Sequence, residues 1–252
     1  MTGKGSLNHN SRKFHAKNTD PNRTHWNVEY CNEDIKDVYH ELFDEALKRY
    51  NDKQTRKDRK IDDYYEKIRS GKQEKLFHEV ILQIGDKDNM RSETMEGQLA
   101  AKILDEYMKG FQERNPTLRV FAAHLHLDEA TPHLHIDFIP YVTGSKRGLD
   151  TRVSLKQALS SLGFKGGSRS ETELNQWVQS EKEKLAMVMR ENEIEWEQKG
   201  THEEHLDVYN FKKKERAKEV KEQEQKIENL TADVEAAESD IKVVSYTHLR
   251  AH

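Results

Sequence analysis

The chain has 252 residues, of which 34% are hydrophobic and 35% are charged, so the length allows one domain of ordinary size with an appendage. A formal net charge of -4 excludes a uniformly basic coat for nucleic acids and leaves only local basic patches. A single cysteine, Cys31, excludes an internal disulfide, and no apolar run reaches the roughly 20 residues of a membrane helix, so we expect a soluble, cytoplasmic protein without membrane insertion.

The first thirty residues have little apolar periodicity and carry two early glycines, which predicts an extended or looped segment. Histidines, cationic residues and a tryptophan are dense there, including His9, Arg12, Arg23 and Trp26. One interpretation is a solvated arm with surface histidines. The other is contact with phosphates and stacking on bases, for which this density is suited.

Helical periodicity of apolar residues predicts an amphipathic helix over residues 32–50 and a shorter helix near 62–70. The basic run between them is either a solvated face or a grip on a DNA backbone. Residues 77–85 are rich in β-branched and apolar residues and stop at a glycine, which is typical of a central strand.

A further helix is predicted over residues 92–112, followed by strands over 118–127 and 133–142 with a turn at 128–131. This order of elements favours an α+β fold, in which helices cover one face of an antiparallel sheet. The other face then stays free for a ligand.

Two basic, glycine-punctuated loops come next, separated by a short helix over residues 156–161. They are either flexible loops or a cradle for an oligonucleotide, since they follow the last predicted strand closely in sequence. The candidate DNA contacts in them are Lys146, Arg147, Arg152 and Lys165.

The C-terminal part is predicted to be helical from residue 172 to 199 and again after Gly200. Val220, Ile227, Val234 and Ile241 repeat every seven residues, which indicates a modest coiled coil and a homodimer; a lone helix is the alternative. Residues 244–252 break the heptads and resemble translated adaptor sequence. We therefore expect three segments: a main domain (1–199), a truncated coiled-coil extension (200–243) and a non-native tail (244–252).

Residues 124–137 contain four histidines and three carboxylates. His133 and His135 are two apart, so on a strand they point the same way and lie about 6.6 Å from each other. The predicted turn folds His126 back beside them. Three histidines with an open fourth position are typical of a catalytic metal site. Imidazoles suit Zn, Fe or Ni, whereas the nearby carboxylates admit Mn or Mg.

Two motifs resemble those of the Pre/Mob plasmid mobilisation and recombination proteins, the MobV-type relaxases. The early segment from His9 to Arg12 is similar to the family's HNxR motif, and residues 20–27 are similar to the stretch that follows it. The histidine cluster resembles the HxDExTPHxH motif through His126, Asp128, Glu129, Thr131, Pro132, His133 and His135. The resemblance covers about residues 3–199.

The resemblance implies an HUH-type sheet and a relaxase that nicks one strand at a plasmid transfer origin. It implies that His126, His133 and His135 hold a divalent ion, Mn²⁺ or Mg²⁺ rather than Zn²⁺. It further implies that His9 is the nucleophile, forming a 5′-phosphohistidine that can later be rejoined, with Glu129 and Arg12 in support. The implied partners are single-stranded or supercoiled origin DNA and the conjugative transfer machinery.

Three alternatives remain open at this point. Relaxases more often use tyrosine, which makes Tyr30 the rival nucleophile. A metal-dependent hydrolase of another phosphate substrate would keep the histidine trio without a task for the basic loops. A non-catalytic DNA-binding protein would leave the trio unexplained. The chain also departs from the family in having only Met1 to Leu7 before its HNxR segment, where an apolar strand is usual.

Overall fold

The computed structural model describes residues 2–3, 6–194, 216–217, 219–231 and 234. The chain divides into two units, Met1–Trp196 and Glu197–His252. The strands of the first unit are β1 (Thr2–Gly3), β2 (Val28–Asn32), β3 (His78–Gln83), β4 (Leu118–His126), β5 (His133–Val142) and β6 (Arg152–Val153). Its α-helices are α1 (Leu7–Asn10), α2 (Ile35–Asp52), α3 (Tyr64–Ser70), α4 (Met95–Lys109), α5 (Phe111–Arg114), α6 (Leu155–Ser161) and α7 (Glu173–Glu191).

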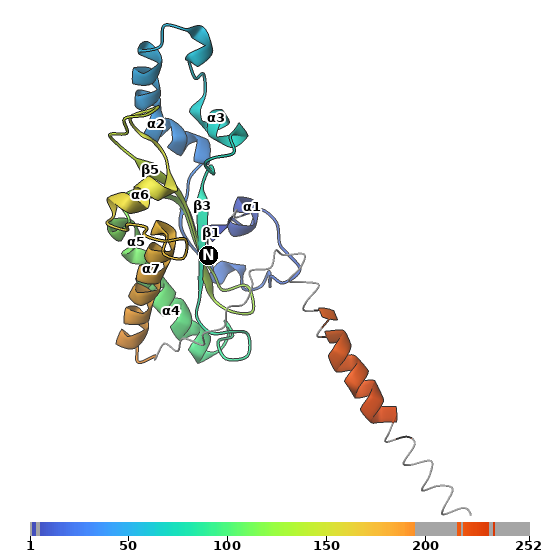
Figure 1. Ribbon diagram of the computed structural model, residues 1–252. Helices are drawn as coiled ribbons and strands as arrows, with labels where there is room; N and C mark the ends of the chain where they lie inside the picture. Colours follow the sequence, from blue (N-terminus) through green and yellow to red (C-terminus); the bar gives the residue numbers. More distant parts are fainter. Residues whose placement is uncertain (1, 4–5, 195–215, 218, 232–233, 235–252) are drawn as a thin grey trace, which may run out of the picture. The chain divides into compact units, whose positions relative to one another are not determined.

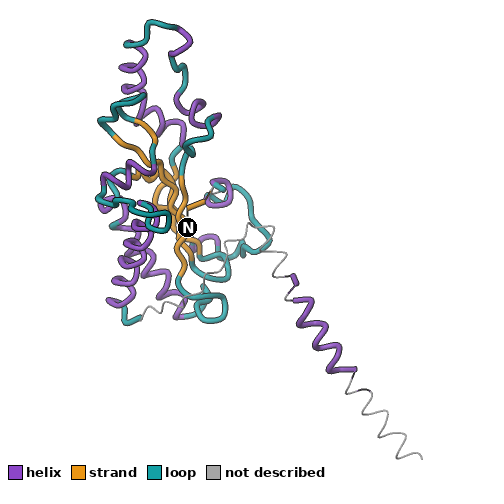
Figure 2. The backbone as a smooth tube through the Cα atoms, in the orientation of Figure 1, coloured by secondary structure: helices purple, strands orange, loops and turns teal. Residues whose placement is uncertain are grey.

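The strands, drawn in orange in Figure 2, form one antiparallel sheet. Their order is β1-β3-β5-β4-β2, and β6 pairs with the end of β5. In this register His126 lies opposite His133, and His124 lies opposite His135. β4 and β5 form within a residue of their predicted bounds, because both stretches are long and rich in apolar residues that alternate with the histidines. The sheet therefore places the histidine cluster on two central, neighbouring strands.

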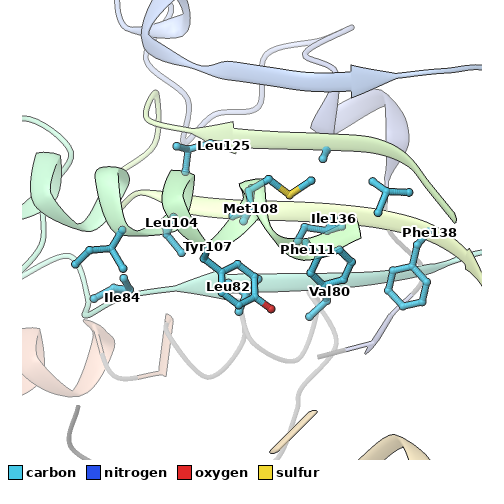
Figure 3. Packing of buried hydrophobic residues seen from close by; sticks show 14 of the residues in the cluster. Val80, Leu82, Ile84, Leu104, Tyr107, Met108, Phe111, Leu125, Ile136 and Phe138 are labelled. Atoms are coloured by element: carbon cyan, nitrogen blue, oxygen red, sulfur yellow. The ribbon is translucent and has the colours of Figure 1, made fainter. Parts of the chain in front are cut away.

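One face of the sheet packs against α4, α5, α6 and α7 (Figure 1). Figure 3 shows Leu82 and Ile136 of the sheet beside Tyr107 and Phe111, and Trp177 of α7 joins the same buried cluster. Along β5, apolar residues such as Ile136 alternate with the histidines, so the core and the site lie on opposite faces of the sheet. The predicted α+β class with an antiparallel sheet is confirmed.

Helices α2 and α3 pack on the opposite face, at one end only. A β-bulge between Val120 and Ala122 adds Phe121 to β4, and Phe121 then lies with Ile139, Phe43 and Tyr64 in a second apolar cluster. Helices α2 and α3 thus cover one end of the face that carries the histidines, and α1 contacts the other end through Asn10. The sequence did not indicate that helices would cover part of this second face.

The N-terminal segment holds more regular structure than the predicted loop. It contains β1 on the edge of the sheet beside β3, the short helix α1, a 3-10 turn (Thr24–Trp26) and the strand β2. The prediction missed β2 because a register shift between Glu29 and Cys31 breaks its alternation. Pairing with β4, which is distant in the sequence, supplies the backbone hydrogen bonds that fix this strand.

In the second unit the described residues 219–231 and 234 are helical. Val220, Ile227, Leu230 and Val234 are exposed on this single chain. Ile241 and the tail over 244–252 lie outside the described residues, so the coiled coil, the tail and the division at residue 199 stay predictions. In the part of the chain that the structure describes, no helix combines the length and the apolar composition needed to cross a membrane.

Candidate metal and nucleophile site

The structure brings the three predicted ligands together. His126 at the end of β4 and His133 and His135 on β5 are buried, with ring centroids 4.8 to 5.2 Å apart. Their ligand atoms lie within 4.8 Å of one another, and His126 Nδ1 is 3.3 Å from His133 Nε2. Two ligands held at about 2.1 Å in tetrahedral geometry are about 3.4 Å apart, so this spacing fits one shared ion.

Each imidazole is fixed through its other nitrogen. His126 Nε2 contacts the carbonyl of Asn10 at 2.8 Å, and His133 Nδ1 contacts the carbonyl of Thr131 at 2.8 Å. His135 Nδ1 lies 2.7 Å from Glu79 Oε1, while its buried Nε2 has no hydrogen-bond partner. Ring N–H groups that donate outward leave lone pairs pointing inward, which is how metal-binding histidines are oriented. The donor set therefore fits a divalent ion.

Glu79 escaped the sequence analysis. It lies on β3 opposite Asp137, on the same face of the sheet as the histidines, and it is buried. The available signal was a charged residue inside a strand of apolar residues, at the parity that faces the site. Burial raises the pKa of Glu79, but the hydrogen bond and charge of His135 outweigh it, so the net pKa is lowered and the side chain is a carboxylate.

Burial also keeps His126 and His133, two of the three predicted ligands, neutral. It lowers the pKa of His126 to about 2, with help from the charges of its histidine neighbours and Arg12. Burial and the neighbouring His135 lower the pKa of His133 to about 4. Neutral imidazoles offer the lone pairs that a metal ion requires.

The predicted nucleophile stands at the edge of this cluster. His9 lies on α1, its ring centroid is 5.9 Å from that of His126 and 6.3 Å from that of His135, and its side chain is 23% exposed. Its Nε2 is 3.3 Å from Glu129 Oε1 and 3.1 Å from Arg12 Nη1. A cavity of about 340 Å³ opens between His9, Glu129, His133 and His135.

Arg12 ties α1 to the turn between β4 and β5. It ends α1 in a left-handed conformation (φ 52°), and its guanidinium donates to both carboxylate oxygens of Asp128 and to Glu129. Burial raises the pKa of both carboxyls, but hydrogen bonds from Arg12 to Asp128 and from His9 to Glu129 outweigh it, so both values fall to about 2. The turn therefore carries two carboxylates at neutral pH.

A second buried network lies beneath α1. The side-chain amide of Asn10 donates to Glu79 Oε1 at 2.8 Å and to Asp137 Oδ2 at 3.0 Å. Burial and the nearby charge of Glu79 raise the pKa of Asp137 to about 7, against the lowering effect of the Asn10 hydrogen bond. A period of two along the strand places Asp137 on the face of His133 and His135, as a possible ligand or orienting group, whereas no sequence pattern assigns a contact to Asn10.

The candidate DNA contacts near the N-terminus serve the fold as well. Arg23 Nη1 donates to the carbonyls of Leu127 and Glu129, and its guanidinium lies 5.9 Å from the ring of Trp26. Arg23 therefore holds the β4–β5 turn, while the Trp26 side chain is 38% exposed beside it.

The basic loops lie far from the histidines. Lys146, Arg147 and Arg152 line a pocket of about 570 Å³ that begins at Val142, the opposite end of β5 from His133. Nine residue steps along a strand span about 30 Å, so closeness in sequence did not become closeness in space. Lys165 lies on the connection between α6 and α7, where its carbonyl accepts from Gln176.

Tyr30 lies away from the site. Its ring packs into the apolar cluster on the helix-covered face of the sheet, and its hydroxyl donates to Asp105 Oδ1 of α4 at 2.8 Å. Burial and the Asp105 carboxylate raise the pKa of this phenol. The geometry favours His9 over Tyr30 as the group that faces the cavity.

Comparison with known proteins supplies the family. A search of curated proteins finds no match. Two solved structures of the MobM relaxase domain, both Mn-bound and in complex with a 22-nucleotide oriT DNA of plasmid pMV158, are similar. The one at pH 5.5 has 24% identity and a TM-score of 0.47, covering 82% of this chain and 90% of that chain. The one at pH 4.6 has 23% identity and a TM-score of 0.46, with the same coverage.

The sequence profile of Mob_Pre, the plasmid recombination enzymes, matches residues 6–213. The match includes the His9 segment, the histidine trio and every α-helix of the first unit. This chain belongs to the Mob_Pre family of plasmid recombination enzymes.

Proposed function

We propose that the chain is a plasmid mobilisation relaxase, which binds a transfer origin, nicks one DNA strand by metal-assisted transesterification and can rejoin it. The observation that carries the proposal is the position of His9. The partly exposed imidazole of His9 lines one cavity together with His133 and His135, two of the three clustered histidines. Transesterification needs a nucleophile that can reach the phosphorus and an electrophilic ion that would polarise an oxygen of the same phosphate.

The ion would be held by His126, His133 and His135, and when bound it polarises a phosphoryl oxygen and offsets developing charge. We propose Mn²⁺ or Mg²⁺, since carboxylates surround the site. The lone pair of His9 attacks phosphorus, the bond to the 3′ oxygen breaks, and the 5′ phosphate stays on the imidazole. Attack by the 3′ hydroxyl reverses the step, and the phosphorus–nitrogen bond conserves the energy for rejoining.

Glu129 and Arg12 support the nucleophile. As the bond to phosphorus forms, the imidazole of His9 becomes cationic, and the Glu129 carboxylate at 3.3 Å offsets that charge. Arg12 holds this carboxylate at 2.9 Å and fixes the turn through Asp128.

The test is a nicking assay on supercoiled origin plasmid with Mn²⁺, followed by detection of a protein-linked 5′ end. We expect His9→Ala to lose the covalent adduct while still binding origin DNA, and Tyr30→Phe to keep it. An adduct that persists in His9→Ala and disappears in Tyr30→Phe would overturn the assignment. Full nicking in excess chelator would contradict the role of the metal.

The same assay separates the alternatives. A metal-dependent hydrolase of another phosphate substrate would cleave without leaving a protein-linked 5′ end. A non-catalytic DNA-binding protein would bind the origin and leave the plasmid supercoiled.

We further propose that origin DNA extends from the cavity to the pocket around Lys146, Arg147 and Arg152. The separation of about 30 Å corresponds to about nine base pairs of duplex at 3.4 Å each. Each lost phosphate contact lowers the salt slope of binding by about 0.9, so Lys146→Ala should flatten it by about that amount. An unchanged slope would remove this pocket from the DNA path.

The remaining partners are proposed on the family resemblance. Homodimers would form through the C-terminal helices, and the nicked strand would be handed to conjugative transfer machinery in the cytoplasm. Sedimentation of the full chain and of a chain ending at residue 199 tests the dimer.

A further inference from the structure

Two sets of side chains in the site have metal-ligand geometry, and they share one residue. The first is the trio His126, His133 and His135, and the second is His9, His126 and Glu129. In each set the ligand atoms lie within 4.8 Å of one another. Two histidines with one carboxylate are themselves a common metal-binding combination. A divalent ion therefore has two places to bind.

The two sets exclude each other. His126 Nε2 donates its proton to the carbonyl of Asn10 at 2.8 Å, so only Nδ1 has a lone pair for an ion. That Nδ1 is the atom 3.3 Å from His133 Nε2. An ion bound to His9 and Glu129 would take this lone pair from the trio.

Arg12 lies against the ligand atoms of the second set, His9–His126–Glu129. His9 Nε2 and Glu129 Oε1 are 3.3 Å apart, which matches the spacing of about 3.4 Å between two ligands of a tetrahedral ion. Arg12 Nη1 lies 3.1 Å from that nitrogen, and Arg12 Nη2 donates to that oxygen at 2.9 Å. The guanidinium thus stands at the two atoms that would bind the ion.

Arg12 is held there firmly. Its side chain is 8% exposed, and its Nε and Nη2 donate to the two oxygens of Asp128, which is fully buried. Guanidinium stays protonated at any working pH, so its charge repels a divalent ion at this distance and its N–H groups cannot become ligands. The trio is not blocked in this way, since His135 Nε2 has no hydrogen-bond partner.

We propose that Arg12 is a positioning residue that keeps the divalent ion out of the His9–His126–Glu129 set and directs it to the histidine trio. The value of this exclusion for nicking rests on the proposed function. The exclusion itself concerns where the ion binds, and it can be measured without DNA.

The experiment uses the full chain without DNA and follows the carbethoxylation of His9 by diethyl pyrocarbonate, mapped by peptide mass spectrometry. Exposed His15 is the internal standard, because it lies outside both ligand sets. The variants are Arg12→Gln, which removes the charge, and Arg12→Lys, which keeps it. Circular dichroism and thermal unfolding establish that each variant is folded.

In wild type and Arg12→Lys, Mn²⁺ or Zn²⁺ should change the modification rate of His9 by less than about twofold. In Arg12→Gln, an ion concentration about ten times Kd should slow it about tenfold, since about one site in eleven stays free. Adding Glu129→Gln to Arg12→Gln should abolish the protection. Equal protection in wild type and Arg12→Gln, or none in either, would overturn the proposal.

A second measurement does not depend on modification chemistry. His133→Ala, which breaks the trio, should lose its ion in equilibrium dialysis, whereas His133→Ala combined with Arg12→Gln should bind one ion again through His9. Equal binding by these two variants would contradict the exclusion. Loss of the DNA adduct is not part of either readout, so failure of the proposed function would leave these outcomes unchanged.

Discussion

Glu79→Gln tests whether the buried carboxylate behind His135 contributes to metal binding. Glu79 Oε1 accepts from His135 Nδ1 at 2.7 Å and from Asn10 Nδ2 at 2.8 Å, and the side chain is buried. A carboxylate in this position fixes the ring and makes the opposite nitrogen a stronger ligand. The substitution keeps the size and one acceptor oxygen but removes the negative charge.

Loss of such a partner lowers metal affinity by about 10- to 100-fold, which is about 1.4 to 2.7 kcal/mol. Because glutamine can still accept from His135, we expect about tenfold for Glu79→Gln. Alanine removes the acceptor of His135. Asn10 then keeps one of its two carboxylate partners, Asp137. We therefore expect Glu79→Ala to lower metal affinity by about a hundredfold.

The assay is competition for Mn²⁺ or Zn²⁺ against a chromophoric chelator at pH 7.5. The matched control is Glu29→Gln, because Glu29 on β2 contacts His124 at 3.3 Å, a histidine outside the ligand trio, and is 57% exposed. The control should change affinity by less than about twofold. If Glu79→Gln binds as tightly as wild type, or if Glu29→Gln weakens binding equally, the orienting role of Glu79 is wrong.

Three further substitutions or conditions test the electrostatics of the fold by urea unfolding of metal-stripped protein. Arg12→Ala leaves buried carboxylates unpaired and should lower the free energy of unfolding by about 3 to 5 kcal/mol, whereas Arg49→Ala, whose partner pair is exposed, should lower it by less than about 1 kcal/mol. Glu181→Ala should also cost about 3 to 5 kcal/mol, because it removes the buried acceptor of an arginine, a tyrosine and an asparagine; a smaller loss would mean that water replaces it. In the folded protein the pKa values of His126 and His133 are about 2 and 4, below the value of 6.5 in the unfolded chain. The free energy of unfolding should therefore fall as the pH drops below 6.5, by about 2 kcal/mol per histidine at pH 5. Equal stability at pH 7.5 and pH 5 would refute these shifts.

The sequence was sufficient for the parts of the site that depend on local periodicity. Alternation over β4 and β5 predicted both strands and placed His126, His133 and His135 on one face. The turn between them required only that two antiparallel strands be joined by a short connection. The trio could therefore be predicted without any long-range contact.

The residues that sequence reasoning missed depend on strand register and on contacts across the chain. Glu79 becomes an orienting group only because β3 pairs with β5 in the register that puts it opposite Asp137. Asn10 is 69 residues from Glu79 along the chain, and no local pattern links the two. The basic loops follow the histidines closely in sequence but lie far from them in space, because β5 carries the chain from one end of the sheet to the other.

The turn between β4 and β5 explains how His9 reaches its position before any ion binds. The side-chain oxygen of Asn27 accepts from the backbone of Leu127 and Asp128, and Ser92 donates to the carbonyl of Glu129. Arg12 then connects this turn to α1. These contacts fix the turn from three separate segments of the chain.

Because the protein's own hydrogen bonds hold both the turn and α1, the distance from His9 to the histidine trio does not depend on the metal. Pre-organised groups need no rearrangement when charge develops, which is the condition under which electrostatic stabilisation is most effective. The backbone of α1 also takes part directly, since the carbonyl of Asn10 contacts His126 while the preceding residue, His9, is the proposed nucleophile. One short helix thus couples the proposed nucleophile to a predicted metal ligand.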